Sequence, residues 1–247
     1  MTETATRNRP RVQLAHAKDA RSVHPMSLRG LVFDFDGLIV DTETATLEAW
    51  REVHAEDGFV ADPRVLHAFV GHVDLAADIW TAYPASADRG SLSARFVENT
   101  RRRCRAAPVL PGARELIETA RAAGLRLAVA SNSSHRHVDG HLAARGLLDL
   151  FHCVVCREDV PRGKPAPDLY LAALGRLGLS AEDAVAFEDS MPGHEAAAAA
   201  GLRVVVVPNP STAGDPFPFA TLRLASLAGA TLPMLAALPP RTAKIAS

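Results

Sequence analysis

The segment LVFDFDGLIVDTE, residues 31–43, limits the possible folds of this chain more than any other segment. An apolar run that begins at Leu31 is typical of a buried strand, yet Asp34 lies near its end and Asp36 and Gly37 follow. An unpaired carboxylate in an apolar interior is strongly destabilising. The sequence therefore predicts a strand whose end opens onto a polar site that uses these charges.

Further apolar runs alternate with helical patterns along the chain. The predicted strands are Leu31–Phe35, Leu125–Ala130, Phe151–Val155, Ala184–Phe187 and Arg203–Val207, with an edge strand near 221–228. Helices predicted over 111–123, 134–145, 167–177 and 190–200 each end before a glycine. Strands that alternate with helices predict an α/β fold, with a parallel sheet covered on both faces.

The segment between the first and second predicted strands is about ninety residues long, too long for a plain crossover. It contains helical patterns of its own, near 42–57, 62–70, 73–82 and 88–105. We therefore expect an inserted helical domain over residues 45–107. The α/β core would then comprise residues 28–44 and 108–247.

Residues 1–27 are polar and basic without a sustained apolar period, so we expect a disordered N-terminal extension. They contain no apolar stretch of the kind found in a secretory signal, and Met26 is an alternative start. The cysteines are only Cys104, Cys153 and Cys156. This small, odd number predicts buried thiols rather than a disulfide framework, and hence a cytoplasmic protein.

Polar residues follow four of the predicted strands. In chain order they are Asp34-Phe35-Asp36-Gly37, Ser131-Asn132-Ser133, Gly163-Lys164-Pro165 and Glu188-Asp189-Ser190. Because ligands of an open α/β sheet bind beyond the carboxyl ends of its strands, these side chains are expected at one site. Several carboxylates at one site require a counter-charge, and an oxygen-preferring cation such as Mg²⁺ would supply it.

The segments DFDGLIVDTE, ASNSS, GKPAPD and FEDSMPGHEAAAAAG resemble the four motifs of the haloacid dehalogenase-like hydrolase superfamily, in order and in spacing. The resemblance covers residues 31–210. The insert directly after the first motif is similar to that of the subgroup with a helical cap there, which includes β-phosphoglucomutase and phosphoglycolate phosphatase. The resemblance implies a Rossmann-like core, a small helical cap and Mg²⁺-dependent phosphoryl transfer.

The resemblance implies roles for the acidic residues. Asp34 would be the nucleophile that forms an aspartyl phosphate, and Asp36 would be the general acid and then the general base. Side chains two positions apart on a strand point the same way, so both can face one substrate. Mg²⁺ would bind Asp34, the Asp36 backbone carbonyl and Asp189, with Glu188 joining directly or through a water.

The resemblance also implies that Ser131, Asn132 and Lys164 bind the phosphoryl oxygens. Composition supports this role for the lysine. The chain has three lysines, and the other two, Lys18 and Lys244, lie in the predicted tails. The single lysine of the folded body thus lies in the loop where a compact positive charge is needed.

Differences from individual subgroups of the superfamily reduce the number of reactions that this chain could catalyse. Dehalogenases of the superfamily lack the second aspartate, whereas Asp36 is present here. Residues 45–107 contain no lysine, which argues against the phosphonate hydrolases, whose cap lysine forms a Schiff base. Thr46 and Asp74 stand where β-phosphoglucomutases have a histidine and an arginine. We therefore expect a phosphatase of a small phosphorylated metabolite, with a sugar phosphomutase as the alternative and a catalytically silent binding protein as a third possibility.

The expected cap would move about hinges near Thr42–Thr46 and Ala106–Pro111, with His72 as a candidate substrate contact. A run of four arginines, Arg101 to Arg103 and Arg105, closes its last helix. Such a run is typical of a solvated helix face that complements the helix C-terminus, and the alternative is attraction of anionic substrates. His137 and His141 share a face of the following helix without a carboxylate to complete a metal site.

Charge and hydropathy exclude other classes of partner. The 27 basic residues and 28 acidic residues nearly balance, so no nucleic-acid or anionic-membrane partner is expected. No apolar run is long enough to span a membrane. We expect a monomer or a weak homodimer.

Overall fold

A parallel sheet lies at the centre of the computed structural model, which describes residues 28–62, 65 and 78–241. The strand order is β3-β2-β1-β4-β5-β6, and every pair is parallel. The strands are β1 (Gly30–Phe33), β2 (Arg126–Ala130), β3 (Cys153–Val155), β4 (Ala184–Glu188), β5 (Arg203–Val206) and β6 (Leu222–Arg223). The five predicted strands and the edge strand are thus confirmed, with ends that differ by a few residues.

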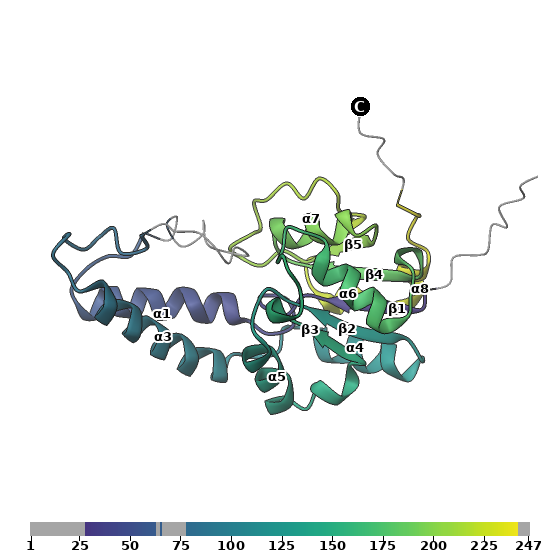
Figure 1. Cartoon of the computed structure of the whole chain (residues 1–247), viewed down its shortest axis with the longest axis horizontal. Coiled ribbons are helices and arrows are strands. Elements are labelled where there is room, and N and C mark those ends of the chain that lie inside the picture. The colour runs from purple at the N-terminus through teal and green to yellow at the C-terminus, as the bar shows by residue number, and fades with distance from the viewer. Residues whose placement is uncertain (1–27, 63–64, 66–77, 242–247) are drawn as a thin grey trace, which may run out of the picture.

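Helices cover both faces of the sheet because alternate strand residues point to opposite sides. Leu31 and Phe33 pack with α4 (Ala113–Ala122), α5 (His135–Ala144) and α8 (Leu232–Ala236). Val32 packs with α6 (Asp168–Leu177) and α7 (Met191–Ala199) on the other face (Figure 1). Short 3-10 turns complete this body: η1 (Leu148–Leu150), η2 (Arg157–Asp159), η3 (Ala181–Asp183) and η4 (Leu227–Gly229). The α/β fold class is confirmed.

Two long helices, α1 (Thr42–Glu56) and α3 (Arg89–Ala106), pair beside the α/β body and form what we call the helical lobe (Figure 1). Asp41 and Asp88 accept backbone N–H bonds at their N-termini and so start them. A small aromatic core holds the lobe together: Trp50, Val53, Trp80, Tyr83 and Leu92.

The helical predictions for the insert have mixed outcomes. The patterns over 42–57 and 88–105 are confirmed by α1 and α3. The predicted helix over 73–82 is wrong in its described part, because residues 79–82 form turns in which the Trp80 side chain enters the aromatic core. Most of the segment 62–70, like His72 and the predicted extension 1–27, lies outside the described residues.

Two chain segments that run side by side join the helical lobe to the α/β body. Val40 forms an antiparallel bridge with Val109, Asp41 N donates to Pro108 O at 3.1 Å, and Leu110 N donates to Ile39 O at 2.9 Å. The hinge predicted at Thr42–Thr46 falls inside the first turn of α1. The short two-stranded junction lies before this helix.

The remaining predictions concern cysteines and membranes. Cys104 and Cys156 are buried, Cys153 is half-buried, and all three are free thiols. No helix in the described part of the chain has the length and apolar character needed to cross a bilayer.

Candidate active site

Three buried carboxylates meet at the carboxyl ends of β1 and β4. Asp34 follows β1, Glu188 ends β4 and Asp189 follows it. Because Phe33 and Phe187 are register partners in these neighbouring strands, the next residues, Asp34 and Glu188, lie side by side. Each of the three offers an oxygen, and these oxygens all lie within 4.8 Å of one another. Strand register thus creates the acidic cluster that the sequence predicted.

Lys164 is the counter-charge of this acidic cluster. It lies in the loop after β3, and its side chain is only 3% exposed. Its ammonium donates to Asp34 and, at 2.6 Å, to Glu188 Oε1, which also accepts from the Tyr170 hydroxyl. Burial alone would lower the pKa of Lys164, but the charges of the two carboxylates outweigh burial and raise it. The lysine therefore carries a full positive charge inside the cluster.

A single ammonium does not balance three carboxylates. Burial and the neighbouring Glu188 and Asp36 charges raise the pKa of Asp34 to about 8, although Lys164 opposes them. Burial and the charges of Asp34 and Glu188 likewise raise the pKa of Asp189 far above its usual range. Asp189 Oδ2 accepts from Asn209 Nδ2 at 2.8 Å, whereas Asp189 Oδ1 is buried without a hydrogen-bond partner. This unpartnered oxygen and the surplus negative charge fit a bound divalent cation.

Asp36 lies beside the cluster, with its carboxylate held by donors from three elements. Oδ1 accepts from Thr42 Oγ1 at 2.8 Å and contacts His137 Nε2 at 2.9 Å. Oδ2 accepts from Ser133 Oγ at 2.6 Å. Burial would raise the pKa of Asp36, but hydrogen bonds from His137, Ser133 and Thr42 lower it below its usual range. Gly37, at φ +74°, allows the turn that brings Asp36 to this position.

The two residues predicted after β2 lie at the site in different ways. Ser131 is buried, and its hydroxyl accepts from Ser133 N at 3.0 Å. Asn132 Oδ1 accepts from Lys164 N at 2.8 Å, and its Nδ2 donates to Lys164 O at 3.3 Å. The Asn132 amide therefore holds the lysine loop in place as well as lining the site.

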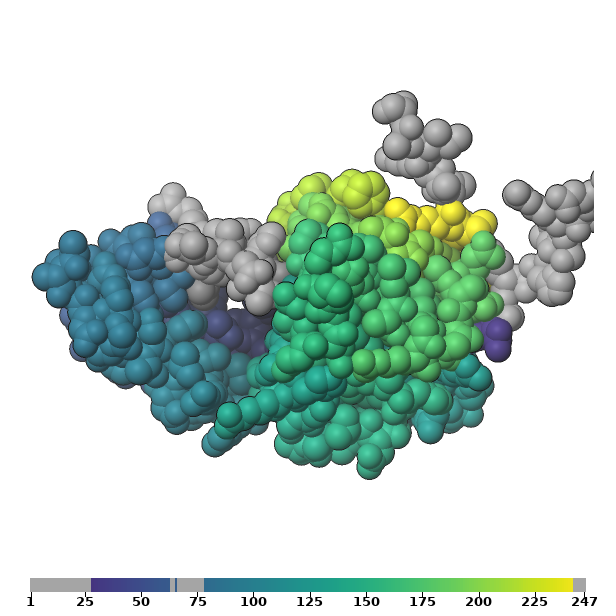
Figure 2. Space-filling model, in the orientation of Figure 1, coloured from purple at the N-terminus to yellow at the C-terminus, as the bar shows by residue number. Residues whose placement is uncertain are grey.

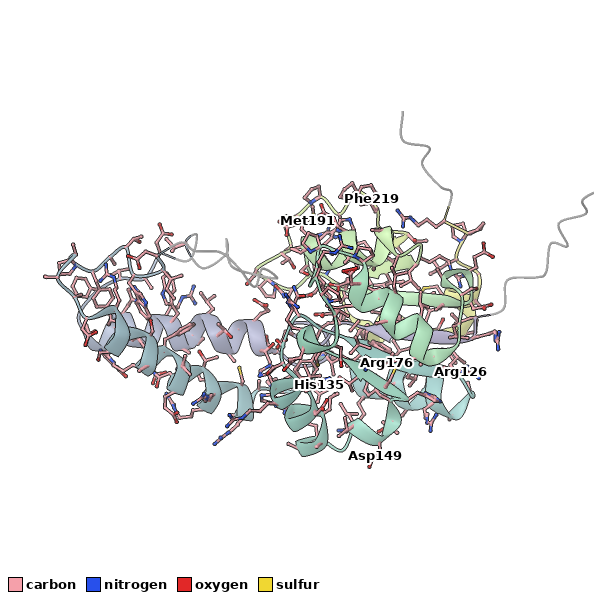
Figure 3. The ribbon with its side chains drawn as sticks, in the orientation of Figure 1. Arg126, His135, Asp149, Arg176, Met191 and Phe219 are labelled. Carbon is pink, nitrogen blue, oxygen red and sulfur yellow. The ribbon has the colours of Figure 1, made fainter. Side chains whose placement is uncertain are left out.

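A pocket of about 420 Å³ opens above these groups, between the helical lobe and the α/β body. Its floor is formed by the residues described above, and its wall on the lobe side by Glu43, Thr46, Thr100 and Cys104. The space-filling view shows a hollow between lobe and body (Figure 2). Arg126 starts β2 at the end of the sheet far from the lobe, whereas His135 lies on the side that faces it (Figure 3). The pocket therefore lies at the carboxyl ends of the strands.

A family model described as haloacid dehalogenase-like hydrolase matches residues 28–201, which include every element from β1 to α7. This chain belongs to the haloacid dehalogenase-like hydrolases. The match confirms the resemblance of the four motifs and makes the chain an enzyme.

Relatives of this hydrolase include phosphatases. Protein CbbY of Rhodobacter capsulatus is 36% identical, over 87% of this chain and 100% of its own length. Hexitol phosphatase B of Escherichia coli is 32% identical, over 82% of this chain and 94% of its own. A crystal structure of a CbbY mutant from Rhodobacter sphaeroides with xylulose-1,5-bisphosphate has a TM-score of 0.68 and 29% identity, covering 82% of this chain and 96% of that one. The hydrolase is therefore a phosphatase-type member of its family.

Several site residues of this hydrolase were not predicted as such. His137 was considered only as a metal ligand and dismissed, yet it contacts Asp36, 101 positions away. Tyr170 and Asn209, each bonded to a carboxylate of the cluster, gave no signal in the sequence. Thr42 and Ser133 stand inside the recognised motifs, so their proximity to Asp36 was open to inference. His72 lies outside the described residues and stays a prediction.

Gly193, in the first turn of α7, gives a test of how tightly Glu188 is enclosed. A β-carbon at Gly193 would collide with the Glu188 carboxyl group, which Lys164 and Tyr170 hold in place. We expect Gly193→Ala to destabilise the protein by about 1–3 kcal/mol, measured by denaturant unfolding. Gly175→Ala, in the interior of α6 with open space around its β-carbon, should stabilise by about 0.5–1 kcal/mol. Equal effects of the two substitutions would contradict this packing.

Proposed function

We propose that this hydrolase is a Mg²⁺-dependent phosphatase that cleaves a small phosphorylated metabolite through an aspartyl-phosphate intermediate on Asp34. The observation that carries the proposal is the juxtaposition of Asp34 with Lys164 on one side and Asp36 on the other. A nucleophile, a phosphate-binding cation and an acid–base group then face one pocket.

Two displacements at phosphorus complete the reaction. A carboxylate oxygen of Asp34 attacks the phosphoryl group, and the bond from phosphorus to the ester oxygen breaks. Because its pKa is lowered, Asp36 must first take up a proton, and it then gives this proton to that leaving oxygen. Asp36 then removes a proton from water, which attacks the aspartyl phosphate and releases inorganic phosphate from Asp34. Each proton that Asp36 gives is thus regained, and the enzyme returns to its starting state.

Other side chains bind and orient the reacting groups. Lys164, with the Ser131 hydroxyl, would bind the phosphoryl oxygens and stabilise their growing charge. Asp34, Asp189 and the Asp36 backbone carbonyl, with Glu188 directly or through water, would hold Mg²⁺. When bound, Mg²⁺ supplies positive charge to the phosphoryl oxygens and offsets repulsion between them and Asp34. These roles follow the family motifs residue by residue.

The helical lobe is the proposed cap of this enzyme. Its α1 and α3 supply Glu43, Thr46, Thr100 and Cys104 to the pocket wall, so a movement of the lobe would change access to Asp34. Closure would exclude water during the first displacement, and opening would release the product. The cap is assigned to residues 45–107, pivoting at the two-stranded junction of Val40 with Val109.

Phosphate release from a panel of sugar, nucleotide and small-acid phosphates, with and without Mg²⁺, tests the proposal. Mg²⁺-dependent release is expected, and its rate should separate good substrates from poor ones. Conversion of one sugar-phosphate isomer into another, without release, would favour the phosphomutase instead. No turnover of any compound would contradict the proposal.

Replacing Mg²⁺ by Ca²⁺ is expected to reduce phosphate release by at least about tenfold. Ca²⁺ accepts more ligands at longer distances, so it would hold Asp34 and the phosphoryl group less tightly aligned. The measurement is the initial rate at saturating concentrations of each ion, after dialysis against a chelator. Equal rates with both ions would show that cation geometry does not align the nucleophile.

The loss of activity on replacing His137 is expected to depend on the leaving group of the substrate. His137→Phe removes one donor from Asp36 and so misaligns the proton transfer to the leaving oxygen. The rate should fall about 10–100-fold for an alkyl phosphate and much less for p-nitrophenyl phosphate, whose phenolate leaves without a proton. His135→Phe is the matched control, because His135 bonds to Asp139 and Asp159 instead. An equal loss for both esters would contradict a role through Asp36.

A further inference from the structure

A second hollow lies beside the active-site pocket, lined by arginines of two helices. Arg101 and Arg105 lie one turn apart on α3, and Arg136 lies in the first turn of α5. They line a cavity of about 270 Å³, which we call the arginine pocket. Three residues line both cavities and make them neighbours: Thr100, Cys104 and His137. The end of α3 lies next to α5 (Figure 1).

The arginine run on α3 divides between two faces of the helix. Arg102 Nη2 and Arg103 Nε donate to the Glu52 carboxylate of α1, at 2.6 Å and 2.8 Å. These two residues therefore hold the helical lobe together. Arg101 and Arg105 point to the arginine pocket and form no ion pair with any side chain in residues 28–62, 65 and 78–241. Of the four arginines in this run, only Arg102 and Arg103 therefore connect α3 to α1.

Arg136 is likewise without an ion-pair partner among the described residues, so three guanidinium groups line the arginine pocket without a neutralising carboxylate. The active-site pocket has a different character, because its lining combines four carboxyl groups, those of Asp34, Asp36, Glu43 and Asp189, with the ammonium of Lys164. A second anionic group on a substrate would be repelled by those carboxylates and attracted by the guanidinium groups next door. The active-site pocket is therefore mainly acidic, and the arginine pocket beside it is basic.

We propose that the arginine pocket binds a second anionic group, a phosphate or a carboxylate, of the substrate whose phosphate ester lies at Asp34. This inference rests on the proposed phosphatase function and deepens it. It names the substrate class as a phosphorylated sugar or acid with anions at both ends, rather than a polyol or nucleoside with a single phosphate. Planar guanidinium groups suit bidentate contacts with either anion.

Matched pairs of substrates test the arginine pocket. One pair is fructose 1,6-bisphosphate and fructose 6-phosphate, and the other is 3-phosphoglycerate and glycerol 3-phosphate. In at least one pair, kcat/KM should favour the member with the second anion by about tenfold or more. The Arg101→Gln/Arg105→Gln protein should lose this preference, mainly through KM. The pair that responds identifies the anion as a phosphate or a carboxylate.

Arg102→Gln is the matched control, since Arg102 lies in the same turn but bonds to Glu52, and it should keep the preference. The inference is overturned if the wild-type protein shows no preference in either pair. It is also overturned if the double variant keeps the preference, or if Arg102→Gln loses it equally.

Hydrolysis of p-nitrophenyl phosphate, which has no second anion, distinguishes a failure of the phosphatase proposal from a failure of the arginine-pocket proposal. If neither this ester nor any substrate of the pairs is hydrolysed, the phosphatase proposal fails. The arginine pocket is then judged by calorimetric binding of fructose 1,6-bisphosphate and fructose 6-phosphate to the Asp34→Asn protein. Binding of the bisphosphate that weakens about tenfold in the arginine double variant would support it, and equal binding would overturn it.

Discussion

Replacing Asp34 by asparagine is expected to reduce phosphate release by at least about 10⁴-fold. The neutral amide cannot attack phosphorus, and no other carboxylate of the cluster takes its place. Glu188 is held by Lys164 and Tyr170, and Asp189 by Asn209. The measurement is single-turnover and steady-state phosphate release at saturating Mg²⁺.

The Asp34→Asn protein should fold, because the substitution removes one of three buried carboxylates that share a single ammonium. Repulsion in the cluster falls, so the melting temperature measured in a chelator should stay the same or rise. A second readout is covalent phosphate on the Asp34 peptide, found by mass spectrometry after acid quench of the wild-type reaction. A variant that keeps more than about a hundredth of the activity would contradict the assignment of the nucleophile.

Replacing Lys164 by methionine is expected to have the largest effect on stability. Methionine approximates the length of the lysine side chain but leaves Asp34, Glu188 and Asp189 without their ammonium. Removing one partner of a buried ion pair costs about 3–5 kcal/mol, and we expect a loss of this size in chelator at neutral pH. Phosphate release should also fall severely, since no charge remains on this side of the phosphoryl group.

The loss in Lys164→Met should depend on pH in a definite direction. Even with the lysine present, burial raises the pKa of Asp34 from 3.8 to about 8. A carboxyl whose pKa is raised by folding is neutral in the folded state at low pH, and it opposes folding increasingly as the pH rises. Without Lys164 the pKa of Asp34 would lie higher still, and wild-type and variant lose stability alike while Asp34 is neutral in both folded proteins, so the stability deficit should grow as the pH rises past about 8. Urea unfolding below and above this pH measures it.

Two comparisons make the lysine experiment specific. Mg²⁺ should restore part of the stability of Lys164→Met, because a cation bound to the same carboxylates replaces some of the missing charge. Arg162→Met, in the same loop, removes an exposed ion pair with Asp168 and should cost far less stability, because solvent screens such a pair. A pH-independent deficit, or one equal to that of Arg162→Met, would show that Lys164 does not neutralise the cluster.

The core of the site was predictable from sequence for a physical reason. In a parallel sheet the carboxyl ends of all strands lie at the same edge. Residues that directly follow the strands therefore lie close together, however the helices pack on the sheet. Asp34, Lys164, Glu188 and Asp189 were placed together by this rule and lie together in the structure. The roles of these residues in catalysis remain proposals, which the experiments on Asp34 and Lys164 address.

Residues on helices were less predictable, because their contacts depend on how each helix is rotated and packed. His137 faces Asp36 only because Val138 and Leu142 turn the opposite side of α5 into the core. The arginine run likewise had two interpretations, and packing of α3 against α1 separates Arg102 and Arg103 from Arg101 and Arg105. Neither distinction is visible in spacing alone.

Local periodicity and chain polarity were enough to predict the strand positions, the parallel α/β fold and the acidic edge of the sheet from the sequence. The side chains that complete the site depend instead on tertiary packing. Thr42, His137 and Ser133 hold Asp36, and Tyr170 and Asn209 hold the acidic cluster. Such contacts join residues far apart along the chain, and they form only when side-chain packing settles the angle and depth at which each helix lies on the sheet.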